Sequence, residues 1–368
     1  MRIEFIDGLR GLSAFIVLYV HYCIFFFPVI PSGFYNSCFI VCEFFVISGF
    51  VLSYRFWKNT NSDVLTSSSL RRYVRLTAAP LISILAFYVL LKLSLVHHVE
   101  IFTLAGASEF THKFFNLTPN LSDALYEGLW GVYFNYNQSS SYNPVLWTMQ
   151  WEFKGSILVA AFLILFGQVR NRLPLYIIFL LVSIDTLYPT FIFGVMFSDL
   201  IYSKEGKNLH EKLKEYKIFS LVLLIIGIFL GLYVYYGNSI LNLYTLLNFE
   251  FLAQKGINHE QLYHMISSAL IMYAILHLEI LKKILSCKIL TKIGEYSFSL
   301  YLIHIHIPLS LGGFILLELL DRGFNITICS IFASSISLWA TIPAVFLLHH
   351  LVDMPAGNLA KRVQKFFE

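Results

Sequence analysis

The stretch that decides the fold is IEFIDGLRGLSAFIVLYVHYCIFFFP, residues 3–28. A membrane-spanning helix needs about 20 mostly apolar residues, so this stretch predicts one. Arg10 and His21 are eleven residues apart. Over about three helical turns, this places both side chains on one face, roughly 16 Å apart along the axis. Arg10 is therefore expected near one membrane surface and His21 within the hydrocarbon.

The depth of His21 allows two interpretations. An ionisable side chain inside a membrane is costly, so it is expected to face a helix-bundle interior or a water-filled cavity. There His21 either takes part in chemistry or only forms a hydrogen bond to a neighbouring helix. The residue alone does not decide between them.

The composition is that of an integral membrane protein. Of the 368 residues, 57% are hydrophobic and only 13% are charged, whereas a soluble chain carries about 25% charged residues. The five cysteines form no CxxC pair and no zinc-type spacing, so we expect packing residues and no metal site. A nucleic-acid partner is not expected. The N-terminal segment lacks a small-x-small cleavage site and is followed by another apolar run, which argues against a cleavable signal.

The apolar segments predict an all-α membrane protein, a polytopic bundle of about ten transmembrane helices within a single domain over residues 1–368. The predicted spans are about 9–29, 34–56, 76–96, 151–169, 173–188, 189–203, 217–236, 263–281, 293–319 and 324–351.

The basic residues orient these spans. With the N-terminus inside, 21 of the 26 lysines and arginines fall on the cytoplasmic side, as the positive-inside rule expects. This predicts a multi-pass cell-membrane protein with both termini in the cytoplasm and long outer loops at about 97–146 and 237–262. In the first loop, Leu121, Leu125 and Leu129 repeat at helical spacing. They predict a short helix at the outer surface, with Ser122-Asp123 as its cap.

Arginines gather at the start of the third predicted span, in the motif Arg71-Arg72-Tyr73-Val74-Arg75. Arg72 and Arg75 are three residues apart and share a helix face. Their forked guanidinium groups suit the oxygens of a phosphate. The other interpretation is a membrane anchor of the positive-inside kind. Arg10 is expected at the same surface, which favours an anion site made of several arginines.

Three further polar residues are singled out by their positions. Glu152 begins the fourth span beside two tryptophans and is either a general base, an orienting carboxylate or an interfacial acid. Tyr301 and His304 share a face of the ninth span, and Pro308 is expected to bend that helix. Other embedded polar residues are expected mostly to form hydrogen bonds between helices. They are Glu43, Asp185, Asp199, His277 and Glu279.

Seven motifs follow one another along the chain: Asp7-Gly8-Leu9-Arg10-Gly11 with His21, Phe44-Phe45-Val46-Ile47-Ser48-Gly49-Phe50, Arg71-Arg72-x-x-Arg75, Leu146-Trp147-Thr148 with Glu152, Phe193-Gly194, Ser297-Phe298-Ser299-Leu300-Tyr301-Leu302-Ile303-His304 and Asp353-x-Pro355. Taken together and in this order, these motifs resemble acyltransferase family 3, the integral-membrane acyltransferases of bacteria, fungi and animals. Two departures are small: Asp353 stands where the family usually has Glu, and Pro80 comes slightly late after the arginines. Glu43 lies near an acidic position of the family but is left out of the catalytic set.

The resemblance implies an O-acyltransferase. Such enzymes move an acyl group, most often acetyl, from cytoplasmic acetyl-CoA or another acyl-CoA to a hydroxyl of a glycan or lipid-linked sugar. O-Acetylation of lipopolysaccharide or another polysaccharide is the common outcome. Acyl-CoA is a co-substrate, and no bound cofactor is expected. Arg10 and His21 match the residues that the family needs for activity.

These expectations assign roles to seven residues. His21 is the predicted general base or acyl carrier, and the sequence does not separate these roles. Glu152 is a second predicted catalytic residue. Substrate binding is predicted for Arg10, Arg72, Arg75, Tyr301 and His304.

A polytopic secondary transporter, or a lipid or glycan flippase, is the alternative class, because ten spans with buried ionisable groups fit it as well. Against this alternative, the two halves of the sequence show no matching pair of helices broken by Gly or Pro.

Overall fold

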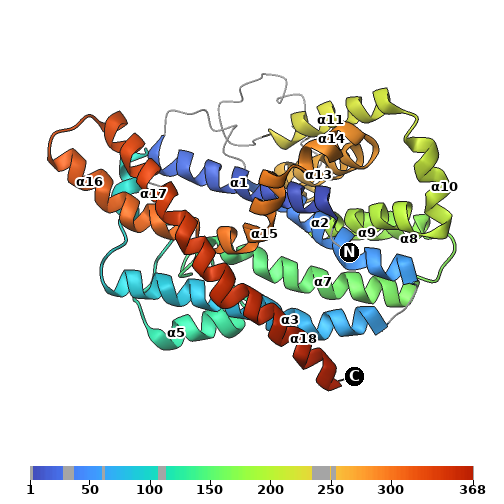
Figure 1. Ribbon diagram of the computed structural model, residues 1–368, viewed down its shortest axis with the longest axis horizontal. Coiled ribbons are helices and arrows are strands. Elements are labelled where there is room, and N and C mark those ends of the chain that lie inside the picture. The colour runs from blue at the N-terminus through green and yellow to red at the C-terminus, as the bar shows by residue number, and fades with distance from the viewer. Residues whose placement is uncertain are drawn as a thin grey trace. The chain divides into compact units, whose positions relative to one another are not determined.

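The computed structural model describes residues 3–27, 37–59, 63–106, 113–233, 249 and 254–367, and within these ranges it contains helices and no strands (Figure 1). This confirms the predicted all-α class. The chain falls into two compact units, each made of three separate segments. Unit 1 comprises Met1–Ser13, Pro31–Leu70 and Trp151–Gly294, and unit 2 comprises Ala14–Ile30, Arg71–Gln150 and Glu295–Glu368.

Five helices of the described chain are long and apolar enough to cross a membrane. Two bent pairs raise the number of possible spans to seven. In one, α13 (His259–His277) and α14 (Glu279–Leu285) meet at 99°. In the other, α15 (Lys288–Ile303) and the segment Pro308–Asp321 meet at 56°, at the proline predicted to bend the chain. The five long helices are α1 (Glu4–Phe26), α2 (Ser37–Asn59), α3 (Asp63–Lys92), α7 (Trp147–Phe166) and α17 (Ile326–Leu348).

A helix overlaps each of the ten predicted spans, but three of these helices are short. They are α8 (Leu173–Val182), α9 (Tyr188–Tyr202) and α11 (Lys217–Gly231). The longest of them has 15 residues and extends about 22 Å, against a hydrocarbon core of about 30 Å. Helix length therefore supports five to seven spans, and the count of ten stays a prediction.

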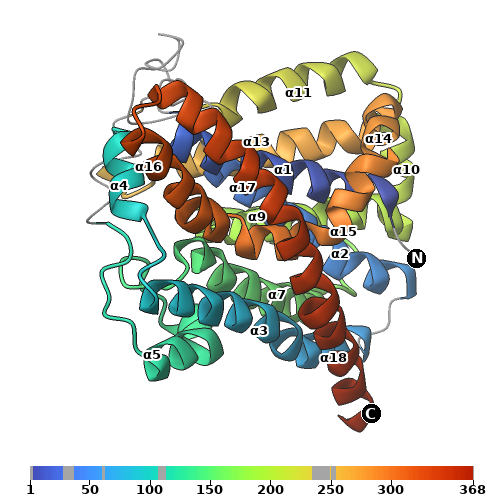
Figure 2. The same ribbon diagram turned by 60° about the vertical axis from the view of Figure 1, so that its left-hand side comes forward.

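Close helix crossings hold unit 1 together, and glycines permit them. A Cβ on Gly194 of α9 would lie 2.1 Å from the Val46 carbonyl oxygen of α2. One on Gly49 would lie 2.0 Å from the Phe191 carbonyl oxygen. The Ser48-Gly49 and Phe193-Gly194 motifs therefore mark a contact of backbone on backbone. Elsewhere in this unit, α11 runs beside α13 (Figure 2).

Two of the embedded polar residues in unit 1 form side-chain hydrogen bonds between elements. Asp199 of α9 accepts two hydrogen bonds from Arg172, each 2.7 Å long, and a third from Tyr176. His277 lies 3.2 Å from His210 of α10 (Lys204–Leu213). For these two residues the predicted hydrogen bonds between elements are confirmed.

The predicted short helix after residue 120 is present in unit 2, as α5 (Leu121–Tyr126), the π-helical turn η3 (Glu127–Gly131) and α6 (Val132–Phe134). The predicted cap is wrong. Asn120 caps α5, because its side-chain oxygen accepts a hydrogen bond from the Ser122 amide at 2.9 Å. Leu121, Leu125 and Leu129 are exposed, as expected for a helix lying against lipid.

The described part of unit 2 also contains six shorter helical elements. The segment Pro308–Asp321 comprises η6 (Pro308–Gly312) and α16 (Gly313–Asp321), and α16 packs beside α17 (Figure 2). Beyond α17 the chain continues through η7 (His349–Asp353) into α18 (Met354–Phe367), the red C-terminal path of Figure 1. Short helices before α5 and α7 are α4 (His98–Leu104) and η4 (Pro144–Leu146). Most of the predicted outer loop 237–262 lies outside the described residues.

Candidate active site

Two histidines from distant parts of the sequence meet in unit 2. His21 lies on α1, and His304 follows the last residue of α15. Their ring centroids are 4.7 Å apart and the rings meet edge to face at 70°. His304 is completely buried and His21 is half-buried. The structure thus brings the predicted catalytic histidine against a residue for which substrate binding was predicted.

Backbone hydrogen bonds orient both rings in the same way. Nδ1 of His21 lies 2.9 Å from the Val17 carbonyl oxygen, and Nδ1 of His304 lies 2.7 Å from the Tyr301 carbonyl oxygen. A carbonyl oxygen only accepts, so each Nδ1 carries the hydrogen. In the neutral rings, each Nε2 then holds the lone pair. The arrangement therefore offers two basic nitrogens.

The Nε2 atom of His304 is buried and has no hydrogen-bond partner among the described residues. Leaving a buried polar atom unpaired is unfavourable by about 1–3 kcal/mol. Such an atom is expected where a substrate group or a proton supplies the missing contact. His306 also has a buried ring nitrogen, Nδ1, without a partner in the described part of the chain, so it is the contact with His21 that singles out His304.

Tyr301 connects the His304 segment to the beginning of α7. Its hydroxyl donates to the Val145 carbonyl oxygen at 2.5 Å and lies 2.9 Å from the Thr148 hydroxyl. Because Tyr301 also supplies the carbonyl that holds His304, these contacts give it a positioning role. Substrate binding by Tyr301 itself stays a prediction.

A polar cluster that the sequence did not single out places this segment along α3. The Ser83 hydroxyl donates to the Leu302 carbonyl oxygen, and His306 Nε2 lies 2.9 Å from the Ser83 carbonyl oxygen. Asn143 donates to the Leu302 carbonyl oxygen as well. Along the axis of α3, Ser83 lies about 17 Å from Arg72 and about 14 Å from Lys92. The His304 segment therefore contacts the middle of this helix.

The predicted donor-binding arginines of unit 2 lie in the first half of α3, nine and twelve residues after its first residue, Asp63. Arg72 is half-buried and Arg75 is exposed. The continuous helix confirms that they are three residues apart on one face. Their role in binding phosphate stays a prediction.

Arg10 and Glu152 belong to unit 1. Arg10 lies on α1, as predicted. Glu152 Oε1 accepts a hydrogen bond of 2.5 Å from the Ser48 hydroxyl, which joins two of the quoted motifs. The sequence did not predict this pair, although both residues stand in those motifs. The roles of Arg10 and Glu152 in binding and catalysis stay predictions.

One family model matches this chain. It describes an acyltransferase domain, Acyl_transf_3, and it covers residues 3–350. No curated protein and no solved structure matches the chain. The matched range is nearly the whole sequence and includes all seven predicted site residues.

Proposed function

The chain belongs to acyltransferase family 3, and from this premise we propose that it transfers an acyl group, most often acetyl, from acyl-CoA to a hydroxyl of a surface glycan or lipid-linked sugar. Acetyl-CoA or another acyl-CoA is the co-substrate. The observation that carries the proposal is the pair of histidines, His21 and His304, each with Nδ1 fixed on a carbonyl and Nε2 basic. The family membership favours this function over a transporter or flippase.

In the proposed reaction, Nε2 of His21 takes the proton of the acceptor hydroxyl as its oxygen attacks the thioester carbonyl. The C–S bond breaks, the acyl group moves to the acceptor oxygen, and the proton passes to the CoA sulfur. In the other route, Nε2 of His21 attacks the thioester carbonyl, the C–S bond breaks and CoA leaves as its thiolate. The acceptor hydroxyl then attacks the acyl group on His21 and gives its proton to Nε2 of His304, the bond between the acyl group and His21 breaks, and the proton passes on to the CoA sulfur. His304 serves as the second base in either route.

We propose that Arg72 and Arg75 bind the phosphates of the acyl-CoA donor. For Arg10 the same role is proposed from its position in the sequence alone. Guanidinium groups suit phosphate because two parallel hydrogen bonds form at once. Glu152 keeps its proposed role as a second catalytic carboxylate, oriented by Ser48.

We also propose ten spans with both termini in the cytoplasm, in the cell membrane and in contact with its lipids. Support comes from a helix that overlaps each predicted span and from the bias of basic residues. In this topology the Arg72 end of α3 meets cytoplasmic acyl-CoA, and the Lys92 end lies at the outer surface.

The test compares His21→Ala and His304→Ala with the wild-type protein in nanodiscs, with acetyl-CoA as donor and extracted surface polysaccharide as acceptor. Release of CoA and mass of the acceptor are followed. Each substitution is expected to lower the rate by about 100-fold or more, since a general base contributes about 10²–10⁴-fold. Acetyl-CoA affinity should change little.

A matched control is His350→Ala, which removes a half-buried histidine of the same unit whose Nε2 lies 3.3 Å from the Tyr296 hydroxyl. It should keep normal activity. Full acetylation by the His21→Ala protein would remove the histidine pair from the mechanism.

A further inference from the structure

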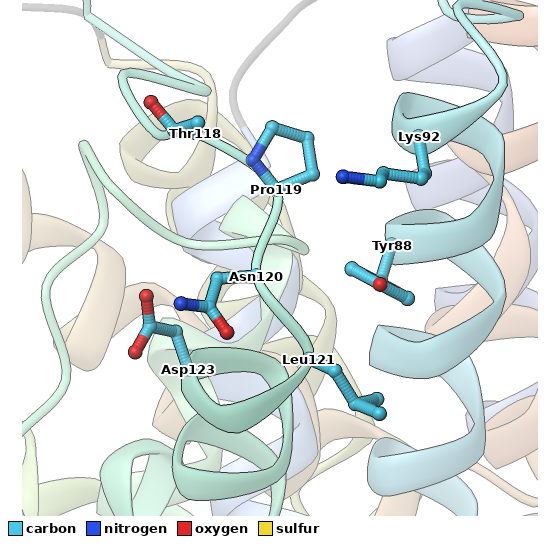
Figure 3. A pocket seen from close by; sticks show the side chains of 7 residues that line it. All are labelled: Tyr88, Lys92, Thr118, Pro119, Asn120, Leu121 and Asp123. Atoms are coloured by element: carbon cyan, nitrogen blue, oxygen red, sulfur yellow. The ribbon is translucent and has the colours of Figure 1, made fainter.

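A polar pocket lies in unit 2 at the Lys92 end of α3. Its volume is about 480 Å³, within the range of small-molecule sites. Tyr88 and Lys92 on α3 face the segment from Thr118 to Asp123, which forms the opposite wall (Figure 3). None of the predicted site residues lines it.

The wall opposite α3 is held rigid. Asn120 exchanges two hydrogen bonds with the Tyr142 hydroxyl, one through its backbone amide and one through its carbonyl, each 2.9 Å long. Its side-chain oxygen caps α5 through Ser122. Tyr142 in turn packs edge to face against Tyr88, with ring centroids 6.0 Å apart. A pocket already fixed by the protein loses little conformational entropy when it binds a ligand.

The lining chemistry fits a ligand that both donates and accepts hydrogen bonds. Lys92 supplies an ammonium group, Asp123 a carboxylate and Thr118 a hydroxyl. Neither Lys92 nor Asp123 is in an ion pair within the described part of the chain. The half-buried ring of Tyr88 adds an apolar face. A sugar, which has many hydroxyls and an apolar ring face, matches this set. A phosphate group does not, because it would meet the Asp123 carboxylate.

The position of the pocket connects it to the histidine pair. Tyr142 precedes Asn143, which donates a hydrogen bond to the Leu302 carbonyl oxygen, two residues before His304. On α3 the pocket extends from Tyr88 to Lys92, about 8 to 14 Å along the helix axis from Ser83, the residue that contacts the same carbonyl. A glycan chain held in the pocket would therefore have a neighbouring unit in the direction of His304.

We propose that this pocket, between Tyr88, Lys92 and the segment 118–123, is a sugar-binding subsite for one unit of the glycan acceptor. That this sugar belongs to the acceptor of the acyl group rests on the proposed function. That the pocket binds a sugar rests on its lining residues and is independent of the proposed function.

The experiment measures binding without turnover. The full-length protein in nanodiscs is mixed with four methyl glycosides, those of glucose, galactose, rhamnose and glucuronic acid, and saturation transfer to each is recorded by NMR. At least one is expected to bind. Tyr88→Ala and Lys92→Ala should each weaken that binding by about tenfold or more, since Lys92 offers a charged donor and Tyr88 a ring face.

Matched controls use exposed residues of the same type that do not line the pocket, Tyr126→Ala and Lys255→Ala. Both should bind as the wild type does. No saturation of any glycoside by the wild type, or an equal loss in the control variants, would overturn the subsite. Sugar binding that persists in a protein without acyl transfer would instead contradict the proposed function and leave the subsite standing.

Discussion

Buried ionisable groups in this protein fall into two kinds. Arg172 and Asp199 satisfy each other through two hydrogen bonds, and the Arg172 guanidinium also lies over the Trp57 ring at 4.6 Å. By contrast, Nε2 of His304 and both carboxylate oxygens of Glu43 have no hydrogen-bond partner in the described part of the chain. The first kind maintains the fold. The second kind leaves atoms available for a proton or a substrate.

The Arg172–Asp199 pair is expected to be structural, so Asp199→Asn should destabilise the protein. Asp199→Asn leaves Arg172 with only the exposed Glu205 carboxylate, 3.3 Å away, as an ion-pair partner in the described part of the chain. Removing one partner of a buried pair typically lowers the free energy of unfolding by about 3–5 kcal/mol. Thermal unfolding in detergent measures the effect. Glu318→Gln is the control, because the ion pair of Glu318 with Arg322 is exposed. The side-chain exposures are 46% for Glu318 and 64% for Arg322, and such pairs contribute about 0–1 kcal/mol. Equal shifts in the two variants would refute the distinction.

Glu127 lies outside the predicted membrane spans, and its burial predicts that the stability of the protein depends on pH. Burial raises its pKa from 4.5 to about 7, although Ser141 and the Tyr142 amide donate hydrogen bonds to it. The folded carboxyl therefore keeps its proton at pH values where the unfolded one has ionised. The contribution of Glu127 to stability is thus largest below pH 4.5 and is lost as pH rises towards 7.

The measurement is the unfolding temperature of wild type and Glu127→Gln at pH 5 and pH 8. The wild type should lose more stability over this interval than the variant, because glutamine does not titrate. If both proteins show the same change, the pKa of Glu127 is not raised in the folded state.

At the scale of elements, the glycine crossings set how closely helices approach. A Cβ on Gly194 would overlap the Val46 carbonyl oxygen, so Gly194→Ala should force α2 and α9 apart. Overpacking of this kind costs about 1–3 kcal/mol or more. Gly357→Ala on α18 is the control, since nothing lies within 4 Å of its Cβ position. Lower expression and unfolding temperature are expected only for Gly194→Ala. Similar behaviour of both variants would contradict the close crossing.

The sequence predicts the helices well, because apolar runs and prolines act locally. The bend at Pro308 and the helix after residue 120 are examples. Prediction from the sequence fails for features that depend on the exact residue at which a helix begins, or on contacts between distant segments. Asn120, not Ser122-Asp123, caps α5, since the chain enters the helix at Leu121, before the predicted cap.

The candidate site shows the same limit. Helical periodicity places Tyr301 and His304 on one face, but it says nothing of what that face meets. The contact of His304 with His21 and the Ser83–Asn143 cluster join segments far apart in the chain. No local pattern in the sequence predicts such contacts.

For the whole molecule, the number of spans depends on the short helices. α8 has ten residues and extends about 15 Å, half of the hydrocarbon thickness. It crosses only if flanking residues extend the path or the bilayer becomes thinner around it. Its exposed apolar side chains, Ile178, Leu181 and Val182, favour contact with lipid.

Cysteine labelling decides between these arrangements. In a Cys287→Ser background, which removes the exposed native thiol, Asn137→Cys, Asp185→Cys and Lys207→Cys are treated in intact cells with a membrane-impermeant maleimide. Ten spans predict labelling at 137 and 185, and at 207 only after permeabilisation, because α8 and α9 would carry residue 185 to the outer surface and back. Protection at 185 together with labelling at 137 would mean that α8 and α9 do not cross. Labelling of 207 in intact cells would invert the topology and place the Arg72 end of α3 away from cytoplasmic acyl-CoA.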